Sequence, residues 1–122
     1  MVKVFLDDIR FPDYVWRDTI DPDYEFNSEW VIVRDYNSFV AFISEHGLPD
    51  LISFDHDLVM DHYREVNQKN IIYENMIEMT GYHAAKWLIS YCAERNLSLP
   101  KCKVHSMNPE GRKNIESILG LN

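Results

Sequence analysis

The sequence predicts an α/β fold, in which helices cover a parallel sheet. Three observations favour this fold. Short apolar runs of strand length alternate along the 122 residues with longer segments whose apolar side chains recur at helical spacing. Strands that are separated by helices are normally parallel. Three of the four apolar runs also end directly in polar and ionisable residues, as expected where the strands of an open α/β sheet meet a ligand site.

Each predicted strand is a short and mainly apolar run. The third run is introduced by the turn signal Leu48-Pro49-Asp50 and is mainly apolar, which is typical of a buried strand. The four runs are Val2–Leu6, Trp30–Tyr36, Leu51–Asp55 and Cys102–Ser106.

Three segments are predicted to be helices because their ends carry helix signals. The first is Asn37–Gly47, with Asn37 or Ser38 as the cap and a glycine at the end. The second, Thr80–Asn96, has the clearest periodicity, since one face collects its large apolar side chains. The third, Asn108–Gly120, has a proline in its first turn and closes the chain.

Length and composition indicate one globular domain spanning residues 1–122. The chain has 20 acidic and 12 basic residues, and its net charge of −8 excludes broad binding of duplex DNA or RNA, which needs a basic surface. No apolar stretch is long enough to span a bilayer and the N-terminus lacks a signal-peptide pattern, so we expect a cytoplasmic protein with no membrane partner. Cys92 and Cys102 are then expected to be reduced core thiols rather than a disulfide.

The polar clusters at the strand ends form the candidate site. They are Asp7-Asp8, Asp55-His56-Asp57 and His105-Ser106-Met107-Asn108. The carboxyl ends of parallel strands meet at one edge of a sheet, so we expect the clusters to converge there. Adjacent carboxylates repel each other, and ionisable groups after a buried strand are unfavourable unless they are paired or bound to a metal. A divalent cation is the natural partner for this charge.

Each cluster also has an ordinary structural interpretation. Paired aspartates are common turn residues, because their side chains bond the backbone. Ser106 or Asn108 could cap the last helix, although a helix N-terminus is also an anion site. Arg10 could form an ion pair with Asp7 or Asp8, or it could reach a phosphate. We favour the phosphate, because the arginine follows the acidic pair on the same loop.

The segment 58–79 has no clear apolar pattern. A segment of this length between a strand and the following helix is usually a lid, a binding loop or an interaction surface. It contains Tyr63, Arg64, Lys69 and Tyr73, which suit a ligand with both a base and a phosphate, and suit a solvated helix equally well.

Four motifs in order carry a family resemblance. They are FLDDIRFP (residues 5–12), SFDHDL (53–58), TGYHAAKWL (80–88) and VHSMNPEG (104–111). Together they resemble the cyclic-phosphate processing receiver-like family, a divergent branch of the receiver fold of response regulators. The resemblance implies a single-domain, three-layer, flavodoxin-like fold with a mostly parallel sheet in the order 2-1-3-4. Receivers have a fifth strand, for which this sequence shows no clear counterpart.

The resemblance also implies roles for individual residues. Receivers place an acidic pair after the first strand, a phospho-accepting aspartate after the third and a serine or threonine after the fourth, around a magnesium ion. The matching residues are Asp7, Asp8, Asp55 and Ser106. The receiver lysine at the end of a fifth strand has no counterpart, since Lys101 and Lys103 precede or lie within the last strand.

Three ionisable residues are additional to the receiver pattern: His56, Asp57 and His105. Imidazoles in place of a fixed lysine change a site that holds a phosphoryl group into one that can move protons. This difference favours chemistry over signalling.

The sequence therefore favours an enzyme, a metal-assisted phosphoesterase that processes cyclic phosphates on nucleotides or RNA ends. The expected cofactor is Mg²⁺ or Mn²⁺, and Zn²⁺ becomes plausible if the histidines coordinate. The predicted metal ligands are Asp7, Asp8, Asp55 and Asp57; the predicted catalytic residues are His105, His56 and Asp55; the predicted phosphate contacts are Arg10, Ser106 and Asn108. We expect His105 to transfer the proton and His56 to orient a neighbour or contact the phosphate.

Two other functions fit the same residues. One is a module that binds a cyclic nucleotide or a partner protein without turnover. The other is a phosphorylatable receiver with Asp55 as the acceptor, to which the absent lysine is the main objection.

Overall fold

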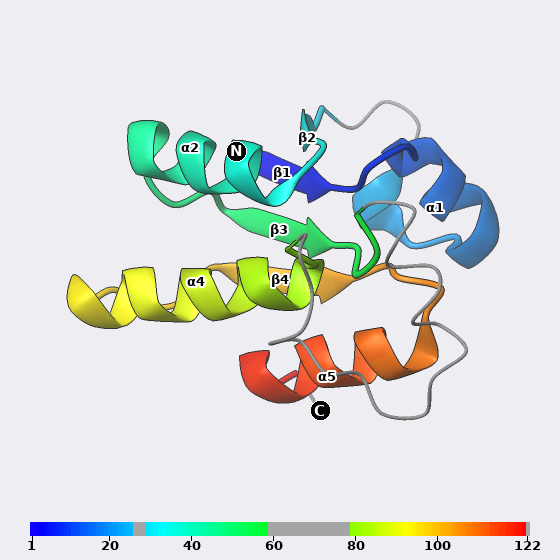
Figure 1. Ribbon diagram of the computed structural model, residues 1–122. Coiled ribbons are helices and arrows are strands. Elements are labelled where there is room, and N and C mark those ends of the chain that lie inside the picture. Colours follow the sequence, from blue (N-terminus) through cyan, green and yellow to red (C-terminus); the bar gives the residue numbers. More distant parts are fainter. Residues whose placement is uncertain (26–28, 59–78, 122) are drawn as a thin grey trace.

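A parallel sheet of four strands lies at the centre of the computed structural model, which describes residues 1–25, 29–58 and 79–121 (Figure 1). The strands are β1 (Lys3–Leu6), β2 (Val31–Val33), β3 (Leu51–Phe54) and β4 (Lys101–Val104). Their order is β2-β1-β3-β4, and every neighbouring pair is parallel. The predicted order and the central position of the first strand are confirmed. The described residues contain no fifth strand.

Helices follow the strands along the chain. They are α1 (Pro12–Thr19), the 3-10 helix η1 (Pro22–Tyr24), α2 (Tyr36–His46), α4 (Gly81–Glu94) and α5 (Pro109–Leu119). The three helices predicted from the sequence are confirmed; α4 and α5 are slightly shorter than predicted, and α2 begins and ends one residue earlier. The elements α1 and η1 were not predicted, because each buries a single residue, Val15 or Tyr24, and so shows no repeating apolar pattern.

The ends of α2 confirm one prediction and correct another. Its cap is Asp35, whose side chain accepts a hydrogen bond from the Ser38 backbone N–H at 2.7 Å. The predicted cap at Asn37 or Ser38 is therefore wrong, since the helix already begins before these residues. The helix ends at Gly47 as predicted, where the backbone φ of 84° favours glycine.

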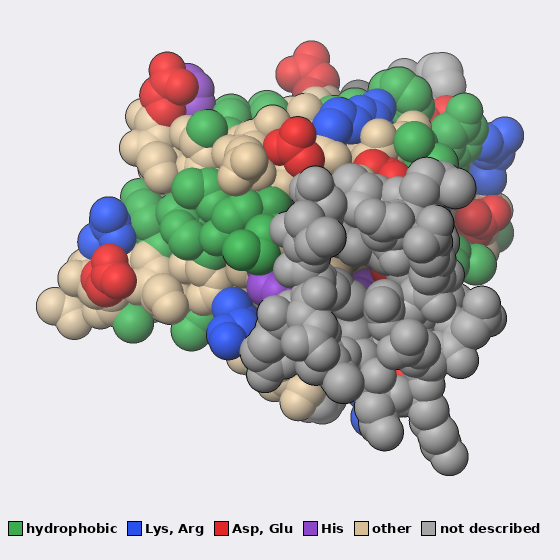
Figure 2. All heavy atoms as spheres, viewed as in Figure 1, with side chains coloured by type: hydrophobic (Ala, Val, Ile, Leu, Met, Phe, Trp, Pro, Cys, Tyr) green, Lys and Arg blue, Asp and Glu red, His purple; other side chains and the backbone are tan. Residues whose placement is uncertain are grey.

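The two faces of the sheet are covered by different elements (Figure 1). One face packs with α2, α4 and α5 in the larger core, whose members include Val4, Leu6, Phe39, Ile43, Ile52, Phe54, Leu88 and Ile115. The opposite face packs with α1 and η1 around Phe5, Val15 and Tyr24. Neighbouring residues of a strand point to opposite faces, so Phe5 belongs to the second core while its neighbours belong to the first. Hydrophobic side chains also gather over α2 and α4 on the surface (Figure 2).

Three further predictions concern the chain as a whole. Cys92 and Cys102 are both buried and free, which confirms that they form no disulfide. None of the helices in the described ranges is long and apolar enough to cross a membrane. The predicted insert at 58–79 lies outside the described residues, apart from its first and last positions.

Candidate functional site

Three strands end in register, and this alignment brings three ionisable residues to one edge of the sheet. The last residues of β1, β3 and β4 lie opposite one another. The next residues are Asp7, Asp55 and His105, and their backbone N–H groups continue the ladder. The Asp55 N–H donates to the Leu6 carbonyl at 2.9 Å and the His105 N–H donates to the Phe54 carbonyl at 3.0 Å. The predicted convergence of the polar strand ends is therefore observed.

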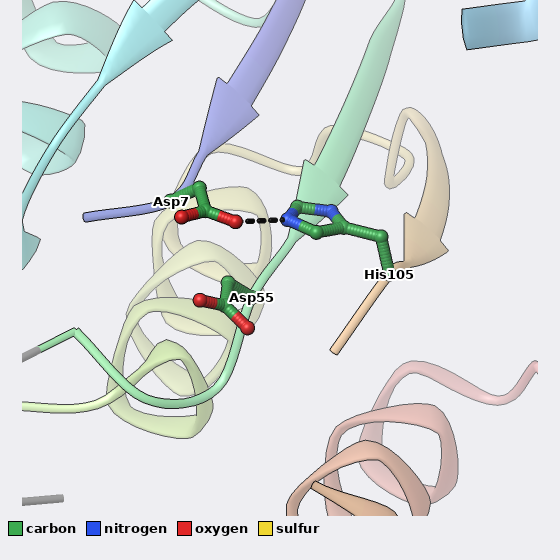
Figure 3. A group of neighbouring side chains, drawn as sticks. All are labelled: Asp7, Asp55 and His105. Carbon is green, nitrogen blue, oxygen red and sulfur yellow. Dashed lines mark hydrogen bonds and ion pairs between the residues drawn. The ribbon is translucent and has the colours of Figure 1, made fainter. Parts of the chain in front are cut away.

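We call Asp7, Asp55 and His105 the strand-end cluster. One carboxylate oxygen of each aspartate and one ring nitrogen of the histidine all lie within 4.8 Å of one another. All three residues are buried, and Figure 3 shows their side chains converging from the ends of β1, β3 and β4.

Asp7 is surrounded by hydrogen-bond donors. Its Oδ1 accepts from the backbone N–H groups of Ile9 and Arg10 at 3.0 and 2.8 Å. Its Oδ2 accepts from Arg10 Nε at 2.9 Å and lies 3.0 Å from His105 Nε2. Burial by itself raises the pKa of Asp7, but the hydrogen bonds from His105 and from the two backbone groups outweigh it and hold the pKa well below its usual range. Asp7 is therefore ionised at neutral pH.

Arg10 bridges the two carboxylates of the strand-end cluster. Besides its bond to Asp7, its Nη2 lies 3.3 Å from Asp55 Oδ1 and donates to the His105 carbonyl at 3.3 Å. The ion-pair alternative for Arg10 is thus confirmed for Asp7 and extends to Asp55. Its predicted contact with phosphate stays a prediction.

Asp55 has the opposite electrostatic character to Asp7. Burial and the nearby Asp7 charge raise the pKa of Asp55 to about 8, and the Arg10 guanidinium offsets this rise only in part. The protein therefore holds a proton on Asp55 at neutral pH in the absence of a metal. A proton retained beside an ionised carboxylate indicates that the cluster lacks positive charge.

The residues of the strand-end cluster fit a divalent cation. Two carboxylates and one imidazole are ligand types that Mn²⁺ and Zn²⁺ accept, and Mg²⁺ accepts the carboxylates. A cation between the carboxylates would replace the proton on Asp55, because it supplies the missing charge.

Both ring nitrogens of His105 have partners. Nε2 faces Asp7, and Nδ1 lies 2.6 Å from Ser53 Oγ. Burial lowers the pKa of His105 although the hydrogen bond to Asp7 opposes it, so the ring is neutral at neutral pH. The neutral ring donates from Nε2 to the carboxylate and accepts from the Ser53 hydroxyl at Nδ1. The side chain is 0% exposed. The predicted proton transfer by His105 stays a prediction, and the enclosed ring favours the role of a ligand.

A second buried polar group joins the end of β3 to the start of α5. We call His56, Asp57 and Asn108 the helix-start network. His56 Nδ1 lies 2.8 Å from Asp57 Oδ1, and Asn108 Nδ2 donates to the two Asp57 oxygens at 3.3 and 3.4 Å. The His56 ring packs so closely on Gly111 that a Cβ there would overlap it. This geometry suits His56 as an orienting residue. Asp57 lies outside the strand-end cluster, and its predicted role as a metal ligand stays a prediction.

Ser106 and Asn108 shape the start of α5. Asn108 Oδ1 accepts from the Gly111 N–H at 3.1 Å, so Asn108 is the cap of the helix. Ser106 Oγ accepts from the Asn108 N–H at 3.1 Å. The capping interpretation is thus confirmed for Asn108, and the phosphate contacts of both residues stay predictions.

Asp8 lies beside the strand-end cluster rather than in it. Its side chain is partly exposed, and it is not among the residues whose ligand atoms converge. Its charge contributes to the raised pKa of Asp55. Direct coordination by Asp8 stays a prediction, and its position next to Asp7 suits a contact through a hydration water.

A cavity of about 220 Å³ gives access to this edge of the sheet. Its walls are formed by Ile9, Arg10, Asp55, Asp57, Met107 and Asn108. The cavity therefore meets the strand-end cluster at Asp55 and the helix-start network at Asp57 and Asn108. A phosphoryl group in it would lie beside both groups.

Three residues that support the site were missed in the sequence. Ser53 Oγ lies 2.5 Å from the Tyr24 hydroxyl as well as beside His105. Arg34 Nη1 donates to the Arg10 carbonyl at 2.7 Å and so fixes the loop after β1. The one available signal was a hydroxyl within the otherwise apolar third strand. Tyr24 and Arg34 had no signal, because their partners come from distant parts of the chain.

Comparison with known families agrees with this geometry. The model of the cyclic-phosphate processing receiver domain matches residues 2–120. The chain belongs to this family. No curated protein and no solved structure matches it.

This receiver domain differs from the receiver pattern at the expected lysine. Lys101 and Lys103 both lie in β4, and Lys103 pairs with Asp21 at 2.6 Å and with Asp23. In the part of the chain that the structure describes, no lysine lines the cavity. Among the described residues, the cation that lines the cavity is Arg10.

Proposed function

We propose that this receiver domain is a metal-assisted phosphoesterase, which opens or hydrolyses a cyclic phosphate on a nucleotide or an RNA end. The observation that carries the proposal is the pair of buried carboxylates at the strand ends, whose oxygens converge with a ring nitrogen of His105 within 4.8 Å. This arrangement favours a divalent cation at the wall of a cavity that accommodates a phosphoryl group. The description of the family supplies the chemical class, a cyclic phosphate.

Asp7 and Asp55 would hold the cation, and Asp8 would hold its hydration water. When bound, the cation supplies Lewis-acid activation of the phosphoryl group and of water. Asp7 anchors the site, because its low pKa keeps it ionised and four donors fix its carboxylate. Asp55 lines the cavity, so it joins the cation to the substrate position.

Arg10 and the start of α5 would bind the phosphate. Arg10 lines the cavity and already carries its guanidinium beside the two carboxylates. A cation there would take over the charge of the carboxylates, which frees the guanidinium to donate to phosphate oxygens. Ser106 and Asn108 lie at the start of α5, where a helix N-terminus favours an anion.

Proton transfer is assigned to Asp57, and His56 would orient its carboxylate. Asp57 lines the cavity, whereas the side chains of His56 and His105 are 0% exposed. As water attacks the phosphorus and the ring P–O bond breaks, the proton lost by the water would go to the Asp57 carboxylate and from there to the released ring oxygen. The hydrogen bonds from His56 and Asn108 would hold that carboxylate toward the cavity. Positioned proton transfer of this kind typically contributes about 10² to 10⁴ in rate.

Product analysis tests the proposal. The protein is incubated with a panel of cyclic nucleotides and with RNA ending in a 2′,3′-cyclic phosphate, with Mn²⁺ or Mg²⁺ and with a chelator. We expect a linear phosphate product that requires the cation and disappears in Asp55→Asn. Binding of the panel without any product would contradict the proposal and favour a binding module. Transfer of a phosphoryl group from a small phosphodonor to Asp55, again without product, would favour a signalling receiver.

A further inference from the structure

A chain of hydrogen bonds leads from the strand-end cluster into the protein. His105 Nδ1 lies 2.6 Å from Ser53 Oγ, and Ser53 Oγ lies 2.5 Å from the Tyr24 hydroxyl. Ser53 and His105 are buried, and Tyr24 is 3% exposed. The second nitrogen of the ring, Nε2, faces the carboxylates of Asp7 and Asp55.

The orientation of the His105 ring is fixed on its faces as well as at its nitrogens. Phe5 stacks on it with ring centroids 4.2 Å apart and an interplanar angle of 8°. Tyr24 meets it edge-on at 6.4 Å. Because two aromatic side chains and both nitrogen partners hold the ring, Nε2 remains directed at the position between the two carboxylates. A ligand that is pre-oriented in this way loses little freedom when it binds a metal.

The hydroxyl of Ser53 suits a metal-bound histidine, because it both donates and accepts. In the metal-free protein it donates to Nδ1 while Nε2–H donates to Asp7. A histidine that binds a metal through Nε2 must carry its proton on Nδ1 and donate it to a partner. The ring would give its Nε2 proton to water and take one at Nδ1 from the Ser53 hydroxyl, which would regain a proton from water through the Tyr24 hydroxyl, so the charge of the ring would not change. Ser53 then accepts from Nδ1 and donates to the Tyr24 oxygen.

Packing alone does not require a hydroxyl at position 53. All four residues of β3 are buried, and an aliphatic side chain there would fill the space without needing a partner. It would leave His105 Nδ1 unpaired in the interior. Ser53 is thus the residue that satisfies this nitrogen in either protonation form of the neutral ring.

We propose that His105 Nε2 is the third protein ligand of the cation, and that Ser53 and Tyr24 position it. This inference rests on the proposed function for the presence of a cation at Asp7 and Asp55. Imidazole nitrogen is a good ligand for Mn²⁺, Co²⁺ and Zn²⁺ and a poor one for Mg²⁺, which prefers oxygen. The site therefore selects a transition metal over Mg²⁺, in contrast to a receiver site built from oxygen ligands.

Titration calorimetry with Mn²⁺ and with Mg²⁺ tests the selection. We expect the wild-type chain to bind Mn²⁺ at least roughly tenfold more tightly than Mg²⁺. His105→Gln should remove most of this preference. Ser53→Ala should lower Mn²⁺ affinity by about 10- to 100-fold, the usual effect of losing the partner of a ligating histidine, while Mg²⁺ affinity changes little. Tyr24→Phe keeps the packing and should act in the same direction, so it carries the test if Ser53→Ala does not fold.

Matched controls separate positioning from general damage to the fold. His46→Gln, Ser90→Ala and Tyr14→Phe make the same chemical changes at exposed sites and should leave the Mn²⁺ to Mg²⁺ preference unchanged. If Ser53 had only a structural role, Ser53→Ala would weaken the binding of both cations equally. Nitrogen NMR with diamagnetic Zn²⁺ gives a direct readout, since the Nε2 signal of His105 should become that of a metal-bound nitrogen with the proton on Nδ1.

The possible outcomes are distinct. Equal affinity for the two cations, or a preference that survives His105→Gln, would overturn the inference and leave the phosphoesterase proposal standing. An absence of any cation binding would overturn both. Selective Mn²⁺ binding without turnover would uphold the inference and contradict the phosphoesterase.

Discussion

Two buried polar groups lie at the same edge of the sheet, and they differ in how their negative charge is balanced. In the strand-end cluster, Asp7 and Asp55 share one guanidinium, and Asp55 keeps a proton. In the helix-start network, the single carboxylate of Asp57 faces His56 Nδ1 and the Asn108 amide. The strand-end cluster is short of positive charge, whereas the carboxylate of the helix-start network is hydrogen-bonded by neighbouring side chains.

This difference indicates which carboxylates favour metal binding. A lone carboxylate whose oxygens are already satisfied by fixed donors gains little from a cation, because the cation must displace those donors and relieves no repulsion between carboxylates. Two buried carboxylates that repel each other gain much, because the cation removes both the repulsion and the retained proton. Both groups contain buried aspartates, so neighbours rather than residue type separate them.

Asp55→Asn should have the largest effect on thermal stability. The variant should melt below the wild type when metal is bound and above it when metal is absent. A cation at 100 times its dissociation constant stabilises the folded state by about 2.7 kcal/mol, which corresponds to a melting temperature increase on the order of 10 °C. The variant should lose this increase. Without metal it should melt above the wild type at pH 8, because the amide removes the repulsion from Asp7. Thermal melts with Mn²⁺ and with a chelator measure both effects.

Asp18→Asn is the matched control, since Asp18 is an exposed aspartate on α1. It should behave like the wild type with and without metal. A full Mn²⁺ response in Asp55→Asn would show that the strand-end cluster does not hold the cation, and the comparison between the two groups would fail.

Asp57→Asn should have the next largest effect, on turnover alone. Because Asp57 is assigned proton transfer and lies outside the cluster, the amide should lower the rate by about 10²-fold. Its affinity for Mn²⁺ should stay within a few-fold of the wild type. Rate measurements at saturating metal, combined with calorimetry, check the two quantities. A large loss of Mn²⁺ affinity would place Asp57 among the ligands and erase the distinction drawn above.

Arg10→Gln should change two affinities in opposite directions. The guanidinium competes with a cation for Asp7 and Asp55, so its removal should tighten Mn²⁺ binding up to about tenfold. The same change removes a phosphate donor from the cavity and should weaken inorganic phosphate binding to the metal-loaded protein by about tenfold. Calorimetry with each ligand measures both, and Arg17→Gln on the exposed side of α1 is the control. Weaker binding of both Mn²⁺ and phosphate would indicate that Arg10 has only a structural role.

The pH dependence of stability should also depend on the metal. The pKa of Asp55 is raised from 3.8 to about 8 in the folded protein, so the folded state binds more protons than the unfolded state between these values. The stability of the metal-free protein should therefore fall as the pH rises from about 4 to about 8. Asp7 has a lowered pKa and contributes only below this window. Denaturant unfolding across the window should show the decline in the wild type and a flatter profile in Asp55→Asn.

The fold was predictable because it depends on short-range patterns. Apolar runs, helix-end signals and the alternation of elements indicated the strands, three helices and the parallel sheet. The convergence of the polar strand ends followed from the same information, but the sequence favoured Asp8 and Asp57 rather than His105 as the further ligands beside Asp7 and Asp55. The location of a residue one position beyond a strand can be predicted without knowing how side chains pack.

The electrostatic roles were not predictable, because they depend on contacts between distant residues. Arg10 had two open interpretations until its neighbours at β3 and β4 were known. The position of Tyr24 depends on η1, which has no apolar repeat to announce it. The burial of the His105 ring depends on Phe5 of β1 and Tyr24 of η1, which both pack on it.

Proton release on metal binding tests most directly the claim that the strand-end cluster is an incomplete cation site. Titration with Mn²⁺ at pH 7 in buffers of different ionisation enthalpy gives the number of protons released. We predict one cation per chain and about one proton released, because Asp55 must ionise when it binds the cation. Asp55→Asn should bind weakly and release none. Tight binding without proton release, or no binding at all, would contradict the account.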